Sequence, residues 1–244
     1  MDNSKILVFD SGKGGLNVLK TLLKMPFFAD YYYLSDSVFA PYGDRSKAFL
    51  LARSRFLLEK YAEGFAAVVL ACNTLSTVVG RDLEKTFSIP IFGVRPMKPR
   101  GKTLLLCTPA TAASERVKNM RSDPALTVCA PKGLVAAIEK NIYNILKGDF
   151  SSAVKFFPEN EGYDSVILGC THFIYLSDLI GSIYSPAVVS DGVSALVDSL
   201  SVRFFSERNI LPTRKKTVKL PEDRFLGVDG GVNYKIFQKM TAFC

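Results

Sequence analysis

Two short apolar runs, each ending in a small residue, a cysteine and a polar pair, constrain this chain more than any other feature. They cover residues 68–74 (VVLACNT) and 166–172 (VILGCTH). Continuous apolar runs of this length are typical of buried parallel strands. Ligands of open α/β sheets bind at the carboxyl ends of such strands. The sequence therefore predicts a thiol at two ligand-binding strand ends, Cys72 and Cys170.

A second pair of apolar runs precedes the cysteine runs at nearly the same interval. Residues 6–12 (ILVFDSG) and 103–109 (TLLLCTP) form this pair; Asp10 precedes Cys72 by 62 residues, and Cys107 precedes Cys170 by 63. Helical stretches alternate with the strands, as in parallel βαβ units. We therefore expect an α/β fold of two pseudo-symmetric domains with mainly parallel sheets flanked by helices, and an active site in the cleft between them.

The segment 93–101 (GVRPMKPRG) predicts the boundary between the two halves. Two prolines, two glycines and three cations make a poor core segment and a good linker. Between the strands, the residue patterns predict single helices over 75–87 and 173–184, among others.

Composition excludes several classes of protein. The 244 residues are 48% hydrophobic, but no run approaches the roughly 18 apolar residues of a membrane helix, and no secretory signal is visible. Five cysteines without a CxxC pair argue against a disulfide framework or a zinc site and predict a reducing cytoplasm. The net charge of +8 comes from scattered residues, which favours a basic surface over nucleic-acid binding.

Paired thiols at two facing strand ends are suited to moving a proton from one face of a carbon to the other. One thiolate would remove a proton while the opposite thiol delivers one. Asp10 and His172, the only histidine of the chain, are the natural proton-transfer partners. Either cysteine alone would more often be an ordinary buried core residue. The matched contexts and the adjacent histidine favour a function for both.

Four motifs in this order, FDSGKGGL (9–16), PYG (41–43), ACNT (71–74) and GCTH (169–172), resemble those of the glutamate racemase family. The resemblance covers about residues 5 to 195 and places the chain in the aspartate/glutamate racemase superfamily. It implies an isomerase that uses neither a cofactor nor a metal. In the family, the product is D-glutamate for peptidoglycan, made in the bacterial cytoplasm.

The resemblance also implies roles for individual residues. Cys72 would take the α-proton of D-glutamate with help from Asp10, and Cys170 that of L-glutamate with help from His172. The residues expected to contact substrate share these motifs, and they are Ser11, Pro41, Tyr42, Gly43, Asn73, Thr74 and Thr171.

The match to the family is incomplete at some positions. Lys13 stands where the family usually has an aliphatic residue. Glu139 is the best candidate for a carboxylate that supports His172, but a solvated helix residue explains it equally well. Since the family's C-terminal segment returns to the first domain, we expect domains of residues 1–95 plus 209–244 and of residues 96–208.

Glutamate is the expected small-molecule substrate, with no membrane or nucleic-acid partner. The sequence leaves open whether the chain forms a homodimer. Aspartate racemase, or another amino-acid racemase of the superfamily, is the alternative within this class. A different class is a catalytically idle binding or inhibitor protein on the same fold, although retention of Cys72, Cys170, Asp10 and His172 argues against it.

Overall fold

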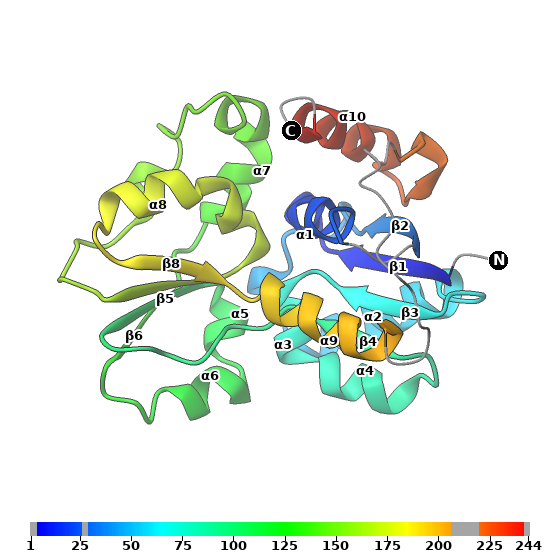
Figure 1. Ribbon diagram of the computed structural model, residues 1–244, viewed down its shortest axis with the longest axis horizontal. Coiled ribbons are helices and arrows are strands. Elements are labelled where there is room, and N and C mark those ends of the chain that lie inside the picture. Colours follow the sequence, from blue (N-terminus) through cyan, green and yellow to red (C-terminus); the bar gives the residue numbers. More distant parts are fainter. Residues whose placement is uncertain (1–3, 26–28, 206–219, 242–244) are drawn as a thin grey trace.

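The computed structural model describes residues 4–25, 29–205 and 220–241. The basic run Arg214-Lys215-Lys216 and Cys244 lie outside the described residues. Within the described parts, the strands form two separate sheets, one from each half of the chain (Figure 1). The predicted α/β fold with two parallel sheets flanked by helices is confirmed.

The first sheet has five described strands in the spatial order β4-β3-β1-β2-β9, and every neighbouring pair is parallel. In chain order, its strands are β1 (Ser4–Asp10), β2 (Ala29–Ser35), β3 (Ala67–Leu70), β4 (Ile91–Gly93) and β9 (Phe225–Leu226). The helical elements of the same part of the chain are α1 (Gly15–Leu22), η1 (Tyr42–Asp44), α2 (Lys47–Tyr61), α3 (Asn73–Val78) and α4 (Gly80–Thr86), with η4 (Glu222–Arg224) and α10 (Gly230–Thr241) beside β9.

The second sheet has four described parallel strands in the order β6-β5-β7-β8. They are β5 (Thr103–Cys107), β6 (Leu126–Cys129), β7 (Ser165–Gly169) and β8 (Val188–Asp191). The helical elements of this part are α5 (Pro109–Ala112), α6 (Glu115–Met120), α7 (Leu134–Ile145), η2 (Val154–Phe156), η3 (Thr171–Leu176), α8 (Ser177–Ile183) and α9 (Val193–Phe205).

The two sheets share one topology. Read as β8-β7-β5-β6, the second sheet repeats the order β4-β3-β1-β2 of the first, so β5 corresponds to β1 and β7 to β3. The two cysteine runs thus form equivalent strands, β3 next to β1 in the first sheet and β7 next to β5 in the second. This correspondence is the structural form of the sequence repeat.

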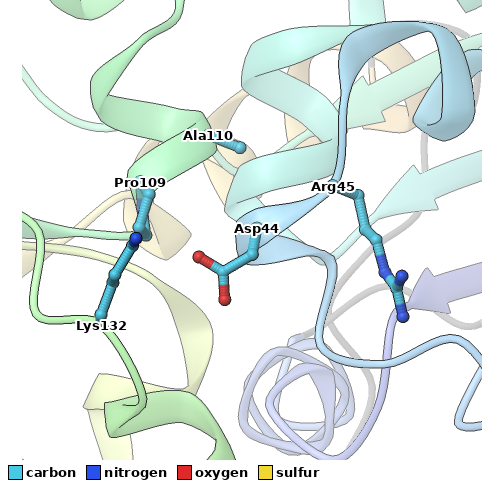
Figure 2. A pocket seen from close by; sticks show the side chains of 5 residues that line it. All are labelled: Asp44, Arg45, Pro109, Ala110 and Lys132. Atoms are coloured by element: carbon cyan, nitrogen blue, oxygen red, sulfur yellow. The ribbon is translucent and has the colours of Figure 1, made fainter.

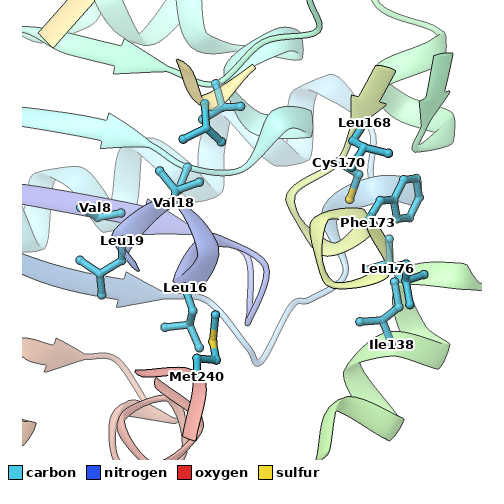
Figure 3. Close-up of a cluster of buried hydrophobic side chains, with 14 of the residues drawn as sticks. Val8, Leu16, Val18, Leu19, Ile138, Leu168, Cys170, Phe173, Leu176 and Met240 are labelled. Carbon is cyan, nitrogen blue, oxygen red and sulfur yellow. The ribbon is translucent and has the colours of Figure 1, made fainter. Parts of the chain in front are cut away.

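Apolar side chains on both faces of the central strands explain why these strands are continuous hydrophobic runs. Val8 of β1 belongs to a cluster that also contains Leu168 of the second sheet (Figure 3). Ile6 of β1 and Leu104 of β5 are members of the same cluster. Leu7 of β1 belongs instead to a cluster on the other face of the first sheet. Because the largest cluster includes residues of both sheets, burial of apolar surface holds the two halves together.

Two predicted helices are interrupted in the structure. The helix expected over 75–87 breaks at Val79, whose φ of −128° and ψ of 0° are not helical, and it forms α3 and α4. The helix expected over 173–184 begins as the 3₁₀ helix η3 and becomes α-helical only at Ser177. The first break separates α3 from α4, and the second lies in the helical stretch that directly follows Cys170.

The division into residues 1–95 plus 209–244 and residues 96–208 stays a prediction. The described part of the tail lies with the first half, since β9 pairs with β2 and α10 contacts α1. Helix α9, inside 96–208, contacts β4 and α1 of the first half (Figure 1).

Candidate active site

The two cysteines lie immediately beyond the carboxyl ends of β3 and β7. Cys72 precedes α3 and Cys170 precedes η3, and their exposed fractions are 6% and 5%. Cys170 lies beside Phe173 and Leu168 at the end of β7 (Figure 3). The proximity of Cys170 contributes to the raised pKa of Cys72, so the two thiols are within electrostatic reach of each other. Both predicted strand-end thiols are therefore present, and both are nearly enclosed.

Cys72 has a serine and a carboxylate in its surroundings. Its thiol donates to Ser11 Oγ over 3.7 Å. Burial first, and the charge of Asp10 second, raise the pKa of Cys72 to about 12. Burial and the nearby negative charge both favour the protonated thiol of Cys72 over the thiolate.

Asp10 ends β1 and is completely buried. Its carboxylate accepts the Gly12 backbone N–H at 2.8 Å and the Thr171 hydroxyl at 3.3 Å. Burial raises the pKa of Asp10, although the charge of His172 opposes that shift. The carboxylate thus influences Cys72 through its charge, while its hydrogen bonds link the first half to the second.

Cys170 is paired with the histidine. Cys170 Sγ lies 3.9 Å from His172 Nδ1, and His172 Nε2 lies 2.6 Å from Glu139 Oε1. Burial lowers the pKa of His172, but the hydrogen bonds to Cys170 and Glu139 outweigh it and raise that pKa well above the ordinary value. The imidazole therefore connects the thiol to a carboxylate of α7.

Glu139 lies next to His172. The sequence alone does not decide between a carboxylate that supports this histidine and a solvated helix residue. Burial raises the pKa of this carboxyl group, but the hydrogen bond and charge of His172, together with Lys13, outweigh it and hold the pKa at about 2. Lys13 Nζ lies 2.6 Å from Glu139 Oε2. The carboxylate thus carries its negative charge between a lysine of the first half and the histidine of the second.

Gly14 permits the close approach of the glycine-rich turn to η3. A Cβ atom at this position would lie 2.5 Å from His172 Nδ1 and 2.7 Å from Thr171 Oγ1. Any side chain here would push His172 away from Cys170. The glycine pattern after β1 is thus explained by packing against the histidine.

The buried side-chain amide of Asn73 indicates most directly that this site binds a polar ligand. It is 1% exposed, and neither its Oδ1 nor its Nδ2 has a hydrogen-bond partner among the described residues. A buried amide without partners is costly, so such a group usually awaits a ligand or water. Asn73 directly follows Cys72, so that ligand would lie beside the thiol.

The remaining predicted substrate-contacting residues gather around the junction of the two halves. Thr74 Oγ1 lies 2.8 Å from Thr108 Oγ1, and Thr111 Oγ1 donates to Thr74 Oγ1 over 3.4 Å. Gly43 of η1 packs against Thr108, and half-buried Pro41 precedes η1. These hydroxyl groups from both halves form a small polar cluster that could receive a carboxylate.

The Tyr42 hydroxyl is directed away from this cluster. It donates to Asp36 Oδ2 at 2.6 Å, and Asp36 is also held by Arg53 in a bidentate ion pair. Burial and the bond to Asp36 raise the pKa of Tyr42. The buried Tyr42 side chain therefore anchors the loop, which leaves backbone groups of this turn for a ligand.

Sequence reasoning did not single out Thr108 and Thr111, whose hydroxyls join Thr74 in the polar cluster. Thr108 directly follows β5, which is equivalent to β1, so it occupies the place that Ser11 has after Asp10. The repeat of apolar runs in the sequence was therefore the signal that could have identified Thr108. Lys13 was visible only as an unusual residue, because its partner Glu139 is 126 positions away.

A pocket opens between the halves next to this junction. It is lined by Asp44 and Arg45 after the PYG turn and by Pro109, Ala110 and Lys132 of the second half. The Asp44 carboxylate points into the gap, whereas Arg45 points away from it (Figure 2). The pocket provides a solvent-facing depression beside Gly43.

The described residues contain no group of three or more His, Cys, Asp and Glu side chains placed to hold a metal ion. No helix in the described ranges has the length and apolar character needed to span a membrane.

The fold and the two thiols define a class, the racemases built from two similar α/β halves, and comparison with known proteins identifies the family. The chain is 32% identical over 217 residues to the glutamate racemase of Leptospira interrogans, which covers 80% of this chain and 81% of that protein. It is 33% identical over 214 residues to the glutamate racemase of Clostridium botulinum, covering 79% and 80%. The chain belongs to the glutamate racemase family.

Solved structures agree with this assignment. The glutamate racemase of Campylobacter jejuni matches with a TM-score of 0.71 at 27% identity, over 87% of this chain and 89% of that one. The Escherichia coli glutamate racemase, solved with L-glutamate and the activator UDP-MurNAc-ala, matches with a TM-score of 0.66 at 27% identity, over 82% of each chain. No protein-family model matches the chain. As an enzyme, the protein is an isomerase of this family.

Proposed function

We propose that this protein interconverts L-glutamate and D-glutamate by a two-thiol mechanism and so supplies D-glutamate for peptidoglycan. The observation that carries the proposal is the pair of nearly buried thiols at equivalent strand ends of two sheets with one topology. Inversion at Cα needs a base on one face and an acid on the other, and in this proposal each half of the protein supplies one thiol.

Proton transfer follows from the surroundings of each thiol. Cys72, assisted by Asp10, removes the α-proton of D-glutamate, while Cys170 returns a proton on the opposite face. With L-glutamate, Cys170 is the base and His172 its proton-transfer partner, since His172 Nδ1 faces the sulfur at 3.9 Å. The carbanionic transition state is stabilised by the polar groups that bind the substrate.

Substrate binding uses the groups that lack partners or point inward. The Asn73 amide binds a polar group of glutamate beside Cys72. The hydroxyls of Thr74, Thr108 and Thr111 receive a carboxylate, and Ser11 and Thr171 complete the polar lining. Pro41 and Gly43 contribute through the backbone of their turn.

The two halves separate to admit substrate, since both thiols are almost completely enclosed. We infer two domains that move about the 93–101 segment, with α9 grouped with the first half because of its contacts with β4 and α1. The free thiols that the mechanism requires are consistent with a reducing cytoplasm.

Circular dichroism tests the activity directly. Incubation of the protein alone with L-glutamate, and separately with D-glutamate, should drive the optical signal of both samples to zero. Parallel samples of L- and D-aspartate distinguish an aspartate racemase. Dialysis against EDTA should leave the rate unchanged, since only side chains carry the proposed reaction. If the optical signal of neither glutamate nor aspartate decays, the protein is not a racemase of these amino acids, and an idle binding protein is favoured.

A further inference from the structure

Lys13 connects the glycine-rich turn of the first half to the second half through three of its own groups. Its backbone N–H donates to Glu139 Oε1 at 2.8 Å, and its carbonyl accepts the Tyr175 hydroxyl at 2.7 Å. Its ammonium lies 2.6 Å from Glu139 Oε2 and donates to the Glu139 carbonyl over 3.1 Å. One residue of the first half is therefore bound to α7 and to η3 at the same time.

These contacts fix the orientation of the Glu139 carboxylate. Oε2 is bound by the ammonium, whereas Oε1 accepts the Lys13 N–H and lies 2.6 Å from His172 Nε2. A Cβ atom on Gly12 would collide with Oε1, so the turn closes tightly over this oxygen. The ammonium also donates to the backbone carbonyl of Glu139, so Lys13 holds both the backbone and the carboxylate of this residue.

The orientation of Glu139 decides which imidazole nitrogen is available to the thiol. A carboxylate that accepts the Nε2 proton leaves Nδ1 as the nitrogen that exchanges a proton with Cys170. Without the ammonium, the Glu139 side chain, 18% exposed, can turn toward water. His172 would then lose the partner that sets its tautomer.

Resting on the two-thiol function proposed above, we infer that Lys13 is a positioning residue of the Cys170 half-site, which holds Glu139 against His172 Nε2 so that Nδ1 serves Cys170. Lys13 touches neither thiol and acts through Glu139. The proposal thus assigns a role in the L-glutamate half-reaction to a residue of the opposite half of the protein.

The neighbours of His172 permit a clean test. Six titratable or charged groups surround the His172–Glu139 pair. They are Asp10, Lys13, Tyr33 and Tyr175, together with Cys170 beside His172 and the Glu139 carboxylate itself. His172 is the only histidine in the chain, so its imidazole signals in nuclear magnetic resonance are assigned without ambiguity.

The experiment compares Lys13→Met, which removes the ammonium, with Lys13→Arg, which keeps the charge. Lys140→Met is the matched control, since it removes an exposed lysine next to Glu139 on α7. In Lys13→Met, the pKa of His172 should fall by about one pH unit as the hydrogen bond to Glu139 is lost. In Lys13→Arg and in Lys140→Met, the pKa of His172 should equal that of the wild type. An unchanged or higher pKa in Lys13→Met would overturn the proposal, because Lys13 would then be only a counter-charge.

A second measurement uses elimination from glutamate analogues that carry a β leaving group. Lys13→Met should reduce elimination from the L-analogue about tenfold relative to the D-analogue. Adding Lys13→Met to Glu139→Gln should cause no further change, since Lys13 acts through Glu139. Equal losses with both enantiomers, or an additional loss in the double variant, would contradict the positioning role.

The histidine titration needs no substrate. If the His172 pKa falls in Lys13→Met but the wild-type protein does not racemise glutamate, the positioning role is sustained and the proposed function is refuted. Racemisation by the wild type together with an unchanged His172 pKa in Lys13→Met would support the proposed function and refute the positioning role.

Discussion

The Cys72 and Cys170 half-sites share a backbone plan but differ in electrostatics. Both cysteines follow the equivalent strands β3 and β7, and both are nearly buried. Cys72 has Ser11 and the charge of Asp10 in its surroundings, whereas Cys170 has the imidazole of His172, backed by Glu139. A negative neighbour favours the thiol, and an imidazolium favours the thiolate.

The difference indicates a division of labour in the ligand-free enzyme. Cys72, with a pKa raised to about 12, rests as the protonated acid. Cys170 has an adjacent nitrogen that can take its proton. A duplicated fold thus supplies two thiols in equivalent positions, and the side chains beside them differ: a carboxylate influences Cys72, and an imidazole lies next to Cys170.

The largest expected effect is the loss of either thiol. Cys72→Ser and Cys170→Ser should each reduce racemisation by about 10³-fold or more in both directions, because inversion uses both groups and a hydroxyl is a poor base. Cys129→Ser, at a half-buried cysteine on β6, is the control and should remain active. Circular dichroism gives the rates. A racemase that survives either site substitution would show that the thiols are not the two bases.

A smaller effect concerns the resting state of Cys72. Its alkylation by iodoacetamide, followed by peptide mass spectrometry, should rise with pH up to about 12, since only the thiolate reacts and burial and Asp10 raise its pKa. Asp10→Asn removes the negative charge and should increase the rate at pH 8 about tenfold. A plateau below pH 9 in the wild type would contradict the acidic assignment of Cys72.

The smallest effect is on acid stability. The pKa of Glu139 is about 2 in the folded protein and 4.5 ordinarily, so its stabilising contribution is complete above 4.5 and is lost as the pH falls toward 2. A pKa held at about 2 instead of 4.5 corresponds to at most about 3 kcal/mol. Because the carboxylate is partly exposed and screened by water, Glu139→Gln should flatten this part of the profile by about 1 kcal/mol in the free energy of unfolding. Chemical denaturation at pH 2 to 6 measures it, and an identical slope in both proteins would show that the carboxylate is not paired.

The sequence predicted the strands and both thiols because continuous apolar runs and a strand repeat are local signals. It failed where contacts join distant residues. The pairing of Lys13 with Glu139 spans 126 positions, and the break at Val79 interrupts a stretch whose residue pattern predicted one helix. The Thr108 hydroxyl was recoverable only by aligning β5 with β1 as equivalent strands.

The assignment of one thiol to each face of the substrate is tested most directly by elimination from enantiomeric glutamate analogues with a β leaving group. The base removes the α-proton and the leaving group departs, so the opposite acid is not needed. Cys170→Ser should retain more elimination from the D-analogue than Cys72→Ser, and the L-analogue should reverse that order. Asp10→Asn should follow Cys72→Ser, and His172→Asn should follow Cys170→Ser. Equal losses in both cysteine variants with both enantiomers would contradict the account.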